Sequence, residues 1–457
     1  MSDHSLPLGP LSRRHFFYGS MLAGAVPAAG FGSTPSLSRA GYKSPNEKLN
    51  IAAIGAGGKG YTDINSCLPE NIVAMADPDD KRAERTFKQF SNVPKYKDFR
   101  VMLDKHVKEI DAVLVSCPDH NHGTAAMWAM SRGKHVYCQK PLVRTVWEAQ
   151  ELMKAARKYG VATQMGNQGY SNPGAREACE IVWNNDIGNV TEVQAWTDRP
   201  GKYWPQSPEV EPKTEAVPSH LDWQAWLSSA PDRPYSPAYA PHHWRGYPEF
   251  GCGAIGDMAC HILGTPNMAL RLSETGPVSV ECVKKEGVGK YCFPHQTVIR
   301  FDFPARGNMP ALKLFWNDSL TGAFHYPGIP DTELLGDKDI NGSLFVGEKG
   351  FLTTGCYGER TRLVPESKWK DYTKPQPLLT RSPGHYRDWI RACKGGAPAC
   401  SNFDVAAPFV SWMLLGVIAM RYSGKLEWDQ KKMQFTNNKE ANQYLKPVFR
   451  KGWKFAG

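Results

Sequence analysis

The sequence lacks the cysteine patterns that mark metal-binding or disulfide-stabilised domains. Its 11 cysteines are an odd number and include no C-x-x-C pair. A zinc ribbon, a redox dithiol and a fully paired disulfide framework therefore all lack support. Cys117 and Cys138 lie in apolar stretches typical of strands, where cysteine behaves as a small hydrophobic residue.

Long apolar runs and nucleic-acid-binding patterns are also missing. No stretch approaches the ~18 consecutive apolar residues that cross a bilayer, so we expect no stable membrane insertion. The formal net charge is +10, but the Lys and Arg residues are scattered and no basic run alternates with aromatic residues. We therefore expect no nucleic-acid partner. The 457 residues, 41% hydrophobic and 22% charged, have the composition of a globular protein with about two or three domains.

Residues 1–45 are typical of an export signal rather than of a folded domain. The twin-arginine motif SRRHFF (residues 12–17) precedes the short apolar stretch MLAGAV (residues 21–26) and small residues around Ala28. A disordered basic tail is the alternative. The pattern favours a twin-arginine signal peptide with a linker, and we expect a periplasmic protein exported by this route.

Residues 46–168 predict an α/β nucleotide-binding half. An apolar strand (residues 49–54) leads into Gly55, Gly57 and Gly60, which fit G-x-G-x-x-G, and a second strand (residues 71–76) ends at Asp77. The glycines allow a tight turn and close approach of a pyrophosphate, and an acid at this spacing can hydrogen-bond the adenosine ribose. Asp77 would repel a 2′-phosphate and so favours NAD, although Lys59 in the turn leaves NADP open.

Two further predicted strands, residues 111–116 and 134–137, end beside polar loops. The first loop holds Pro118 and His122, and the second holds Lys140 in YCQKPL. Ligands of parallel sheets bind at the carboxyl ends of the strands, so both loops are expected at the cofactor site. A single lysine in such a loop is more often a surface residue. The His120-x-His122 pair lacks a third ligand nearby, and we predict no metal site.

Residues 169–457 predict an α+β domain with a large open, mainly antiparallel sheet. Residues 191–196 and 298–303 alternate with a period of two, residues 312–316 are compact and apolar, and two apolar segments flank the turn at residues 347–350. An apolar helix near the C-terminus (residues 406–420) is expected to pack back on the body. Since a large apolar sheet face is seldom left in water, we expect a homodimer or homotetramer.

An insertion at residues 198–249 is rich in aromatic residues and proline. Loops of this length are usually functional or disordered, and the aromatic residues argue against disorder. They offer faces on which sugar rings can stack, or they form a small core of the loop itself. Both interpretations remain open.

Asp257 and His261 follow this insertion. They are four residues apart, so on a helix they share one face. An Asp that orients a His, beside a lysine, would form a proton-transfer set for oxidising a secondary alcohol. Without other support, Asp-x-x-x-His is common on solvated helix faces.

The motifs GAGGKG, ADP, CPDHNH, GKHVYCQKPL and GDMACH, in this order, resemble the Gfo/Idh/MocA oxidoreductase family over nearly all of the chain after the leader. The leader and the stretch LDWQAWL (residues 221–227) look like an exported branch. The resemblance implies a Rossmann domain with bound NAD or NADP, a second domain that forms much of the subunit interface, and substrates among sugars, cyclitols and their derivatives.

The resemblance also assigns roles to residues. Lys140 matches the lysine that binds both cofactor and substrate, His261 the general base, and Asp257 a substrate-binding or orienting group. The matches to cofactor-binding positions are Gly55, Gly57, Gly60, Asp77, Pro118 and His122. The chain departs from the family at Gln139, where the Glu-Lys-Pro motif has glutamate.

These features predict an NAD(P)-dependent oxidoreductase that acts on a secondary hydroxyl of a sugar, cyclitol or sugar derivative. Because a periplasm has no free nicotinamide pool, the cofactor is expected to stay tightly bound and to be recycled. One alternative is a redox-assisted glycoside hydrolase, in which transient oxidation of the sugar permits elimination of the aglycone. A second is a non-catalytic sugar-binding protein.

Overall fold

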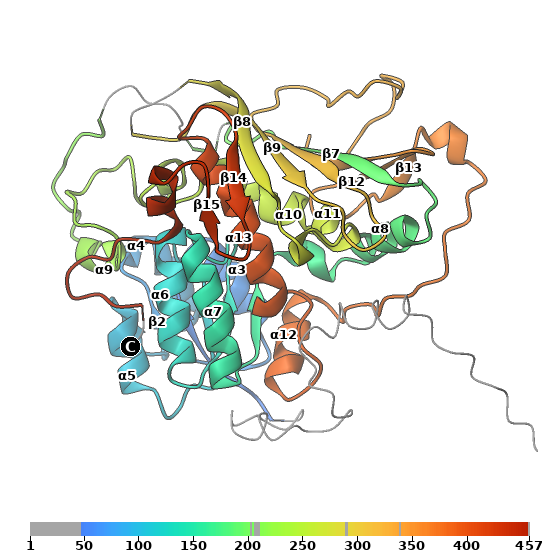
Figure 1. The fold of residues 1–457 in the computed structure, drawn as a ribbon. Coiled ribbons are helices and arrows are strands. Elements are labelled where there is room, and N and C mark those ends of the chain that lie inside the picture. The colour runs from blue at the N-terminus through green and yellow to red at the C-terminus, as the bar shows by residue number, and fades with distance from the viewer. Residues whose placement is uncertain (1–46, 202, 205–210, 288–290, 338–339, 456–457) are drawn as a thin grey trace, which may run out of the picture.

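The computed structural model describes residues 47–201, 203–204, 211–287, 291–337 and 340–455 (Figure 1). The predicted signal peptide and linker lie outside these residues. Two sheets dominate the described part, one in each half of the chain. No helix among the described residues has the length and apolar character needed to cross a membrane. All eleven cysteines are free thiols.

The first sheet is parallel and has the strand order β3-β2-β1-β4-β5-β6. Its strands are β1 (Asn50–Ile54), β2 (Asn71–Ala76), β3 (Lys95–Tyr96), β4 (Ala112–Val115), β5 (His135–Cys138) and β6 (Thr163–Met165). The helices between them are α3 (Lys59–Ser66), α4 (Asp80–Gln89), α5 (Phe99–Lys105), α6 (Asp119–Met130) and α7 (Val146–Tyr159). This is the strand order of a dinucleotide-binding Rossmann fold, as predicted.

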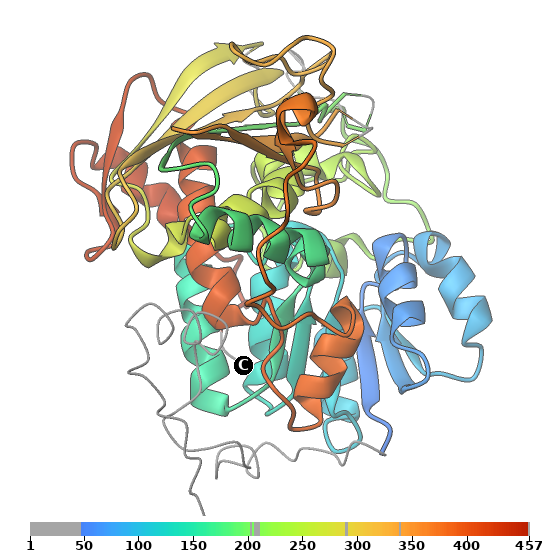
Figure 2. The same ribbon diagram turned by 90° about the vertical axis from the view of Figure 1, so that its right-hand side faces the viewer.

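Alternate residues of each central strand face opposite sides of this sheet. On one side, Val113 and Val115 of β4 pack with residues of α5, α6 and α7. On the other, Leu114 packs with residues of α3 and with Trp389 and Cys393 of α12 (His385–Cys393). Figure 2 shows α12 beside the strands of the first half. A segment more than 200 residues away in sequence therefore completes one face of the nucleotide-binding sheet, which the sequence did not indicate.

The second sheet is mixed, with the order β13-β12-β11-β7-β10-β9-β8-β14-β15. Its strands are β7 (Val190–Trp196), β8 (Ser279–Glu286), β9 (Gln296–Phe303), β10 (Leu312–Asn317), β11 (Gly342–Gly347), β12 (Phe351–Thr354), β13 (Arg362–Val364), β14 (Leu426–Asp429) and β15 (Gln434–Phe435). Neighbouring strands are antiparallel except β7 and β10, which are parallel. The predicted α+β half with a mainly antiparallel sheet is confirmed.

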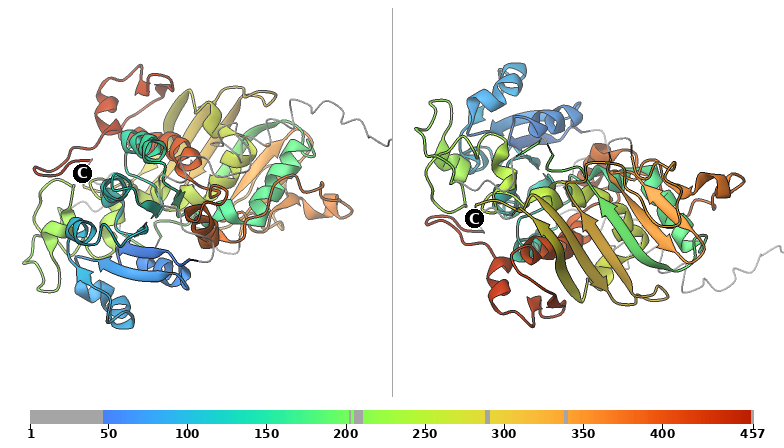
Figure 3. Two further views of the ribbon diagram at one scale, coloured as in Figure 1. Left: turned by 90° about the horizontal axis from the view of Figure 1, so that it is seen from below. Right: turned by 90° about the horizontal axis from the view of Figure 1, so that it is seen from above.

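Helices cover one face of the second sheet and leave the other open (Figure 3). The remaining α-helices are α8 (Pro173–Trp183), α9 (Trp223–Leu227), α10 (Cys260–Ile262), α11 (Gly264–Ala269) and α13 (Phe403–Ala419). Helix α13 is the apolar helix predicted near the C-terminus, and it packs between α7 and strands β8 and β9. The 3₁₀-helical segments are Gln168–Ser171, His243–Gly246, Leu272–Glu274, Glu366–Trp369 and Glu440–Leu445, and Ile255–Ala259 is π-helical.

The open face is less apolar than expected. In β9 the buried residues alternate with Gln296, Val298, Arg300 and Asp302, which are only partly buried. Arg300 forms ion pairs with Asp302 and with Glu281 of β8. This part of the face therefore carries paired charges beside Val298 rather than only apolar side chains.

Candidate active site

A cavity of about 660 Å³ opens at the carboxyl ends of the parallel strands, a volume within the range of small-molecule sites. Residues from both halves of the chain line it. Of the residues predicted for the site, only Gly60 is absent from the lining. The predicted residues that line the cavity are Gly55, Gly57, Asp77, Pro118, His122, Lys140, Asp257 and His261. Among the residues that the structure describes, no group of three His, Cys, Asp or Glu side chains could hold a metal ion.

The glycine turn leaves no room for side chains. Gly55 has a φ of +87°, and a Cβ there would lie 2.6 Å from the Ser116 carbonyl oxygen. A Cβ on Gly60 would lie 2.1 Å from the Gly55 carbonyl oxygen, so Gly60 permits close packing of α3 beneath the turn rather than lining the cavity. The turn thus brings bare backbone and the positive N-terminus of α3 to the cavity, an arrangement that fits a pyrophosphate.

Asp77 supports the turn from below and also faces the cavity. Its Oδ2 accepts hydrogen bonds from the N–H groups of Ala56 (2.8 Å) and Gly57 (3.1 Å), and its Oδ1 accepts one from the Asp79 N–H (3.0 Å). Burial raises the pKa of Asp77, and these three backbone donors oppose that shift. The Oδ1 atom, which accepts one of these bonds, retains acceptor capacity, so Asp77 can still accept a ribose hydroxyl.

The segment from Asp119 to His122, predicted as a loop, is the first turn of α6, which Pro118 precedes as N-cap. His122 is buried, with Nδ1 2.6 Å from the Pro141 carbonyl oxygen and Nε2 2.8 Å from that of Cys117. It therefore ties the Pro118 turn to the segment that carries Lys140. His120 is bonded to the Trp226 carbonyl oxygen (2.9 Å), and burial lowers its pKa to about 3.

Lys140 forms a tight pair with Asp257. Its Nζ donates to the Asp257 Oδ1 (2.6 Å) and to the Asp257 backbone oxygen (2.7 Å). An ammonium has three N–H donors, so one is left for a ligand. Arg245 lies 3.3 Å from the Asp257 Oδ1 and 3.2 Å from Asp119. Lys140 and Arg245 hold the pKa of Asp257 well below its usual range, although the partial burial of the carboxylate opposes this shift.

His261 is buried, and its surroundings favour the neutral form of the imidazole. Burial is the main cause of a pKa well below 6.5, and the charge of Lys140 lowers it further. Its Nδ1 is buried and has no hydrogen-bond partner among the described residues, and its ring centroid lies 4.7 Å from that of Tyr357. Asp257, in the π-helical segment Ile255–Ala259, pairs with Lys140 instead of orienting His261 as expected.

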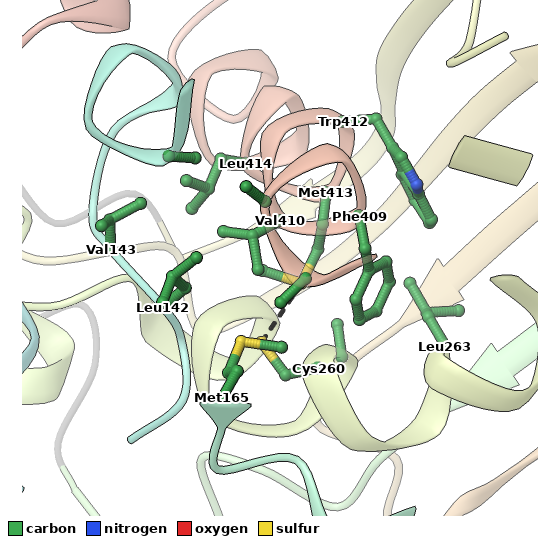
Figure 4. Packing of buried hydrophobic residues seen from close by; sticks show 14 of the residues in the cluster. Leu142, Val143, Met165, Cys260, Leu263, Phe409, Val410, Trp412, Met413 and Leu414 are labelled. Atoms are coloured by element: carbon green, nitrogen blue, oxygen red, sulfur yellow. Dashed lines mark hydrogen bonds between the residues drawn. The ribbon is translucent and has the colours of Figure 1, made fainter. Parts of the chain in front are cut away.

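The core between the two halves fixes both segments that carry these groups (Figure 4). Leu142 and Val143 follow Lys140, and Cys260 precedes His261. All three are buried in one cluster with Met413 and other residues of α13. The Cys260 Sγ lies 3.6 Å from the Met413 Sδ. Packing at the joint of the two halves therefore sets the relative positions of Lys140 and His261.

Several residues of the cavity wall carry no motif that predicts them from the sequence. Arg199 and Arg245 come from the long insertion, and Tyr357 follows β12. Most aromatic residues of the insertion are buried in a small core of their own, formed by Leu221, Trp223, Trp226, Leu227, Ala230, Tyr235, Tyr239, Ala240, Trp244, Tyr247, Phe250 and Cys292. Trp226 and Trp244 of this core also line the cavity. The loop-core interpretation therefore accounts for most of them.

Comparison with known proteins agrees with this architecture. Residues 49–167 match the oxidoreductase family model with an NAD-binding Rossmann fold, and residues 190–291 match the model of its C-terminal alpha/beta domain. The chain belongs to the Gfo/Idh/MocA oxidoreductase family. Its first half is the NAD-binding domain of that family.

Curated relatives of the family include sugar and cyclitol dehydrogenases. Levoglucosan dehydrogenase of Pseudarthrobacter phenanthrenivorans is 24% identical over 48% of this chain and 50% of its own length. Inositol 2-dehydrogenase of Salmonella typhimurium is 24% identical over 39% of this chain and 54% of its own length. The chain thus matches about half the length of these two relatives.

Solved structures share the fold at low identity. The WlbA dehydrogenase from Bordetella pertussis, in complex with NADH and UDP-GlcNAcA, has a TM-score of 0.58 and 16% identity, covering 84% of this chain and 99% of its own. The aldose-aldose oxidoreductase from Caulobacter crescentus, complexed with glycerol, has a TM-score of 0.53 and 14% identity, covering 83% of this chain and 100% of its own.

Proposed function

We propose that the protein is an NAD(P)-dependent oxidoreductase that oxidises a secondary hydroxyl of a sugar, cyclitol or sugar derivative. One observation carries the proposal: a neutral, buried His261 lines the same cavity as the paired Lys140 and Asp257, below a glycine turn suited to a dinucleotide. The dehydrogenases among the relatives, which act on levoglucosan and inositol by name, support this substrate class.

The residues of the cavity divide the chemistry between them. When bound, a nicotinamide cofactor supplies the hydride acceptor. Gly55, Gly57 and Asp77 would hold its pyrophosphate and adenosine ribose. Neutral His261 can accept the proton that the substrate hydroxyl must lose.

Lys140 can use its third N–H to stabilise the developing negative charge on the substrate oxygen. Asp257 is too weak a base at neutral pH, because Lys140 and Arg245, which both contact its Oδ1, hold its pKa well below its usual range. Its role is to hold Lys140 in place.

The test combines cofactor analysis with a substrate panel on one sample. Purified protein is denatured and the released nucleotide is identified by mass spectrometry, while the intact protein is assayed against sugars and cyclitols. We expect released NAD(H) or NADP(H) and substrate-dependent reduction of the cofactor. Absence of any nucleotide, with no binding on titration, would refute the proposal. Release of aglycone from chromogenic glycosides without net reduction would instead identify the redox-assisted hydrolase.

Two further proposals rest on the sequence. We infer export to the periplasm by the twin-arginine route, with a tightly held cofactor recycled in the site. A double Arg13→Lys, Arg14→Lys variant should accumulate in the cytoplasmic fraction, and a wild-type protein found only there would refute export. We also propose a homodimer or homotetramer, for which light scattering during gel filtration gives the mass directly. A monomeric mass at working concentration would refute it.

A further inference from the structure

The position before Lys140 carries an amide where the family motif has a carboxylate. Gln139 is buried, and its Nε2 donates to both oxygens of Asp63, at 3.1 and 2.9 Å. Its Oε1 accepts a hydrogen bond from the Lys140 backbone N–H (3.3 Å). The amide therefore connects a carboxylate on α3 to the backbone of the lysine that we place in the active site.

Asp63 is fully buried and collects donors from four parts of the chain. Besides Gln139, its oxygens accept from Lys59 Nζ (2.5 Å), Ser116 Oγ (2.7 Å) and Tyr386 Oη (2.6 Å). Lys59 belongs to the glycine turn and α3, Ser116 follows β4, and Tyr386 lies on α12. Because Lys59, Ser116 and Gln139 all line the cavity, this buried carboxylate organises its wall from behind.

Only one negative charge fits at this place. A glutamate at position 139, in the conformation of the present side chain, would bring a second carboxylate to about 3 Å from that of Asp63. Two carboxylates this close cannot both stay ionised. The amide packs closely against Gly166, where an added Cβ would lie 2.7 Å from the amide carbon. An amide at position 139 can donate a hydrogen bond to a carboxylate at position 63, and an amide at position 63 could likewise donate to a carboxylate at position 139.

We infer that Asp63 carries the single negative charge of this cluster, and that it acts as a positioning residue for Lys59 directly and for Lys140 through Gln139. The inference rests on the proposed function in one respect: it assumes that Lys140 and Lys59 face a bound dinucleotide. The charge arrangement itself is a property of the cofactor-free protein.

Exchange of the two groups tests the inference. Asp63→Asn, Gln139→Glu and the double variant are compared with wild type for NADH affinity, by fluorescence titration, and for the melting temperature of cofactor-free protein. Each single variant should bind NADH about tenfold more weakly, the scale of coupled neighbouring groups. The double variant restores one carboxylate and one amide, and its affinity should return to within about threefold of wild type.

The pH dependence of NADH affinity and a control variant distinguish an effect of the position of the charge from a general disruption of the fold. Gln139→Glu should regain NADH affinity as the pH is lowered, because the introduced carboxyl takes up a proton. Asp318→Asn changes another buried carboxyl group, directly after β10 and outside the cavity wall, and should not rescue Gln139→Glu.

Two outcomes overturn the inference: a double variant whose losses equal the combined losses of the single variants, or single variants with unchanged affinity and melting temperature. If wild-type protein binds no dinucleotide, the proposed function fails. Recovery of the melting temperature in the double variant then still decides the role of Asp63.

Discussion

Replacement of His261 by alanine should abolish most turnover with little loss of stability. The Nδ1 atom has no hydrogen-bond partner in the described part of the chain, so the substitution breaks no hydrogen bond at that atom. The stability cost is then mainly lost packing against Tyr357. A general base contributes about 10²–10⁴ to the rate, which corresponds to about 2.7–5.4 kcal/mol of transition-state stabilisation. We therefore expect kcat to fall by this factor.

The pH profile gives a second, independent readout. Only neutral His261 can accept a proton, and burial together with Lys140 lowers its pKa well below 6.5. The neutral form therefore persists below pH 6.5, and kcat/KM should fall only when the pH drops through the lowered pKa. An ordinary exposed histidine would lose its base form near pH 6.5.

The assay is steady-state cofactor reduction from acid to neutral pH, with melting curves of the same samples. His135→Gln is the matched control, since this histidine is also buried but lies at the start of β5, outside the cavity lining. Its turnover should match wild type. Near-normal turnover of His261→Ala, or an acid limb of wild type at or above pH 6.5, would remove His261 from the mechanism.

Three other changes test separate parts of the molecule. Lys140→Ala should cut turnover by about 10²–10⁴ in the same assay, and a smaller loss would make its pairing with Asp257 merely structural. Asp77→Ala should weaken NADH binding in a fluorescence titration, whereas unchanged affinity would mean that the ribose is held elsewhere. Trp389→Ala should cost about 3–5 kcal/mol in urea unfolding, because this fully buried side chain packs under the first sheet, and a cost below about 1 kcal/mol would exclude that role.

Local sequence patterns predicted the nucleotide-binding sheet well. Buried parallel strands appear as continuous apolar runs, and the glycine turn needs specific residues at fixed spacing. A capping box begins α7, in which Thr145 and Glu148 are bonded to each other's backbone N–H groups, and Thr-x-x-Glu is the spacing that such a start requires. The sequence predicts a loop where α6 begins, because Pro118 precedes this helix without a side-chain capping hydrogen bond.

Local sequence patterns could not predict contacts between segments that are far apart in the sequence. Trp389 lies under the first sheet, and Tyr386 reaches Asp63 across more than 300 residues of sequence, yet α12 resembles any other amphipathic helix. Arg245 shows the same limit within the insertion. Its sequence neighbours indicate an aromatic loop, and only the fold brings its guanidinium between Asp119 and Asp257.

That guanidinium changes the assignment of acid and base in the site. Asp119, Arg245, Asp257 and Lys140 form a row of alternating charges, with successive contacts of 3.2, 3.3 and 2.6 Å. A carboxylate between two cations is stabilised as an anion and loses its value as a proton acceptor. His261 lies outside the row and is kept neutral by burial and by the nearby lysine. The Asp-x-x-x-His spacing suggested that Asp257 assists the histidine directly, whereas in the structure Asp257 pairs with Lys140, and we propose that His261 alone accepts the proton.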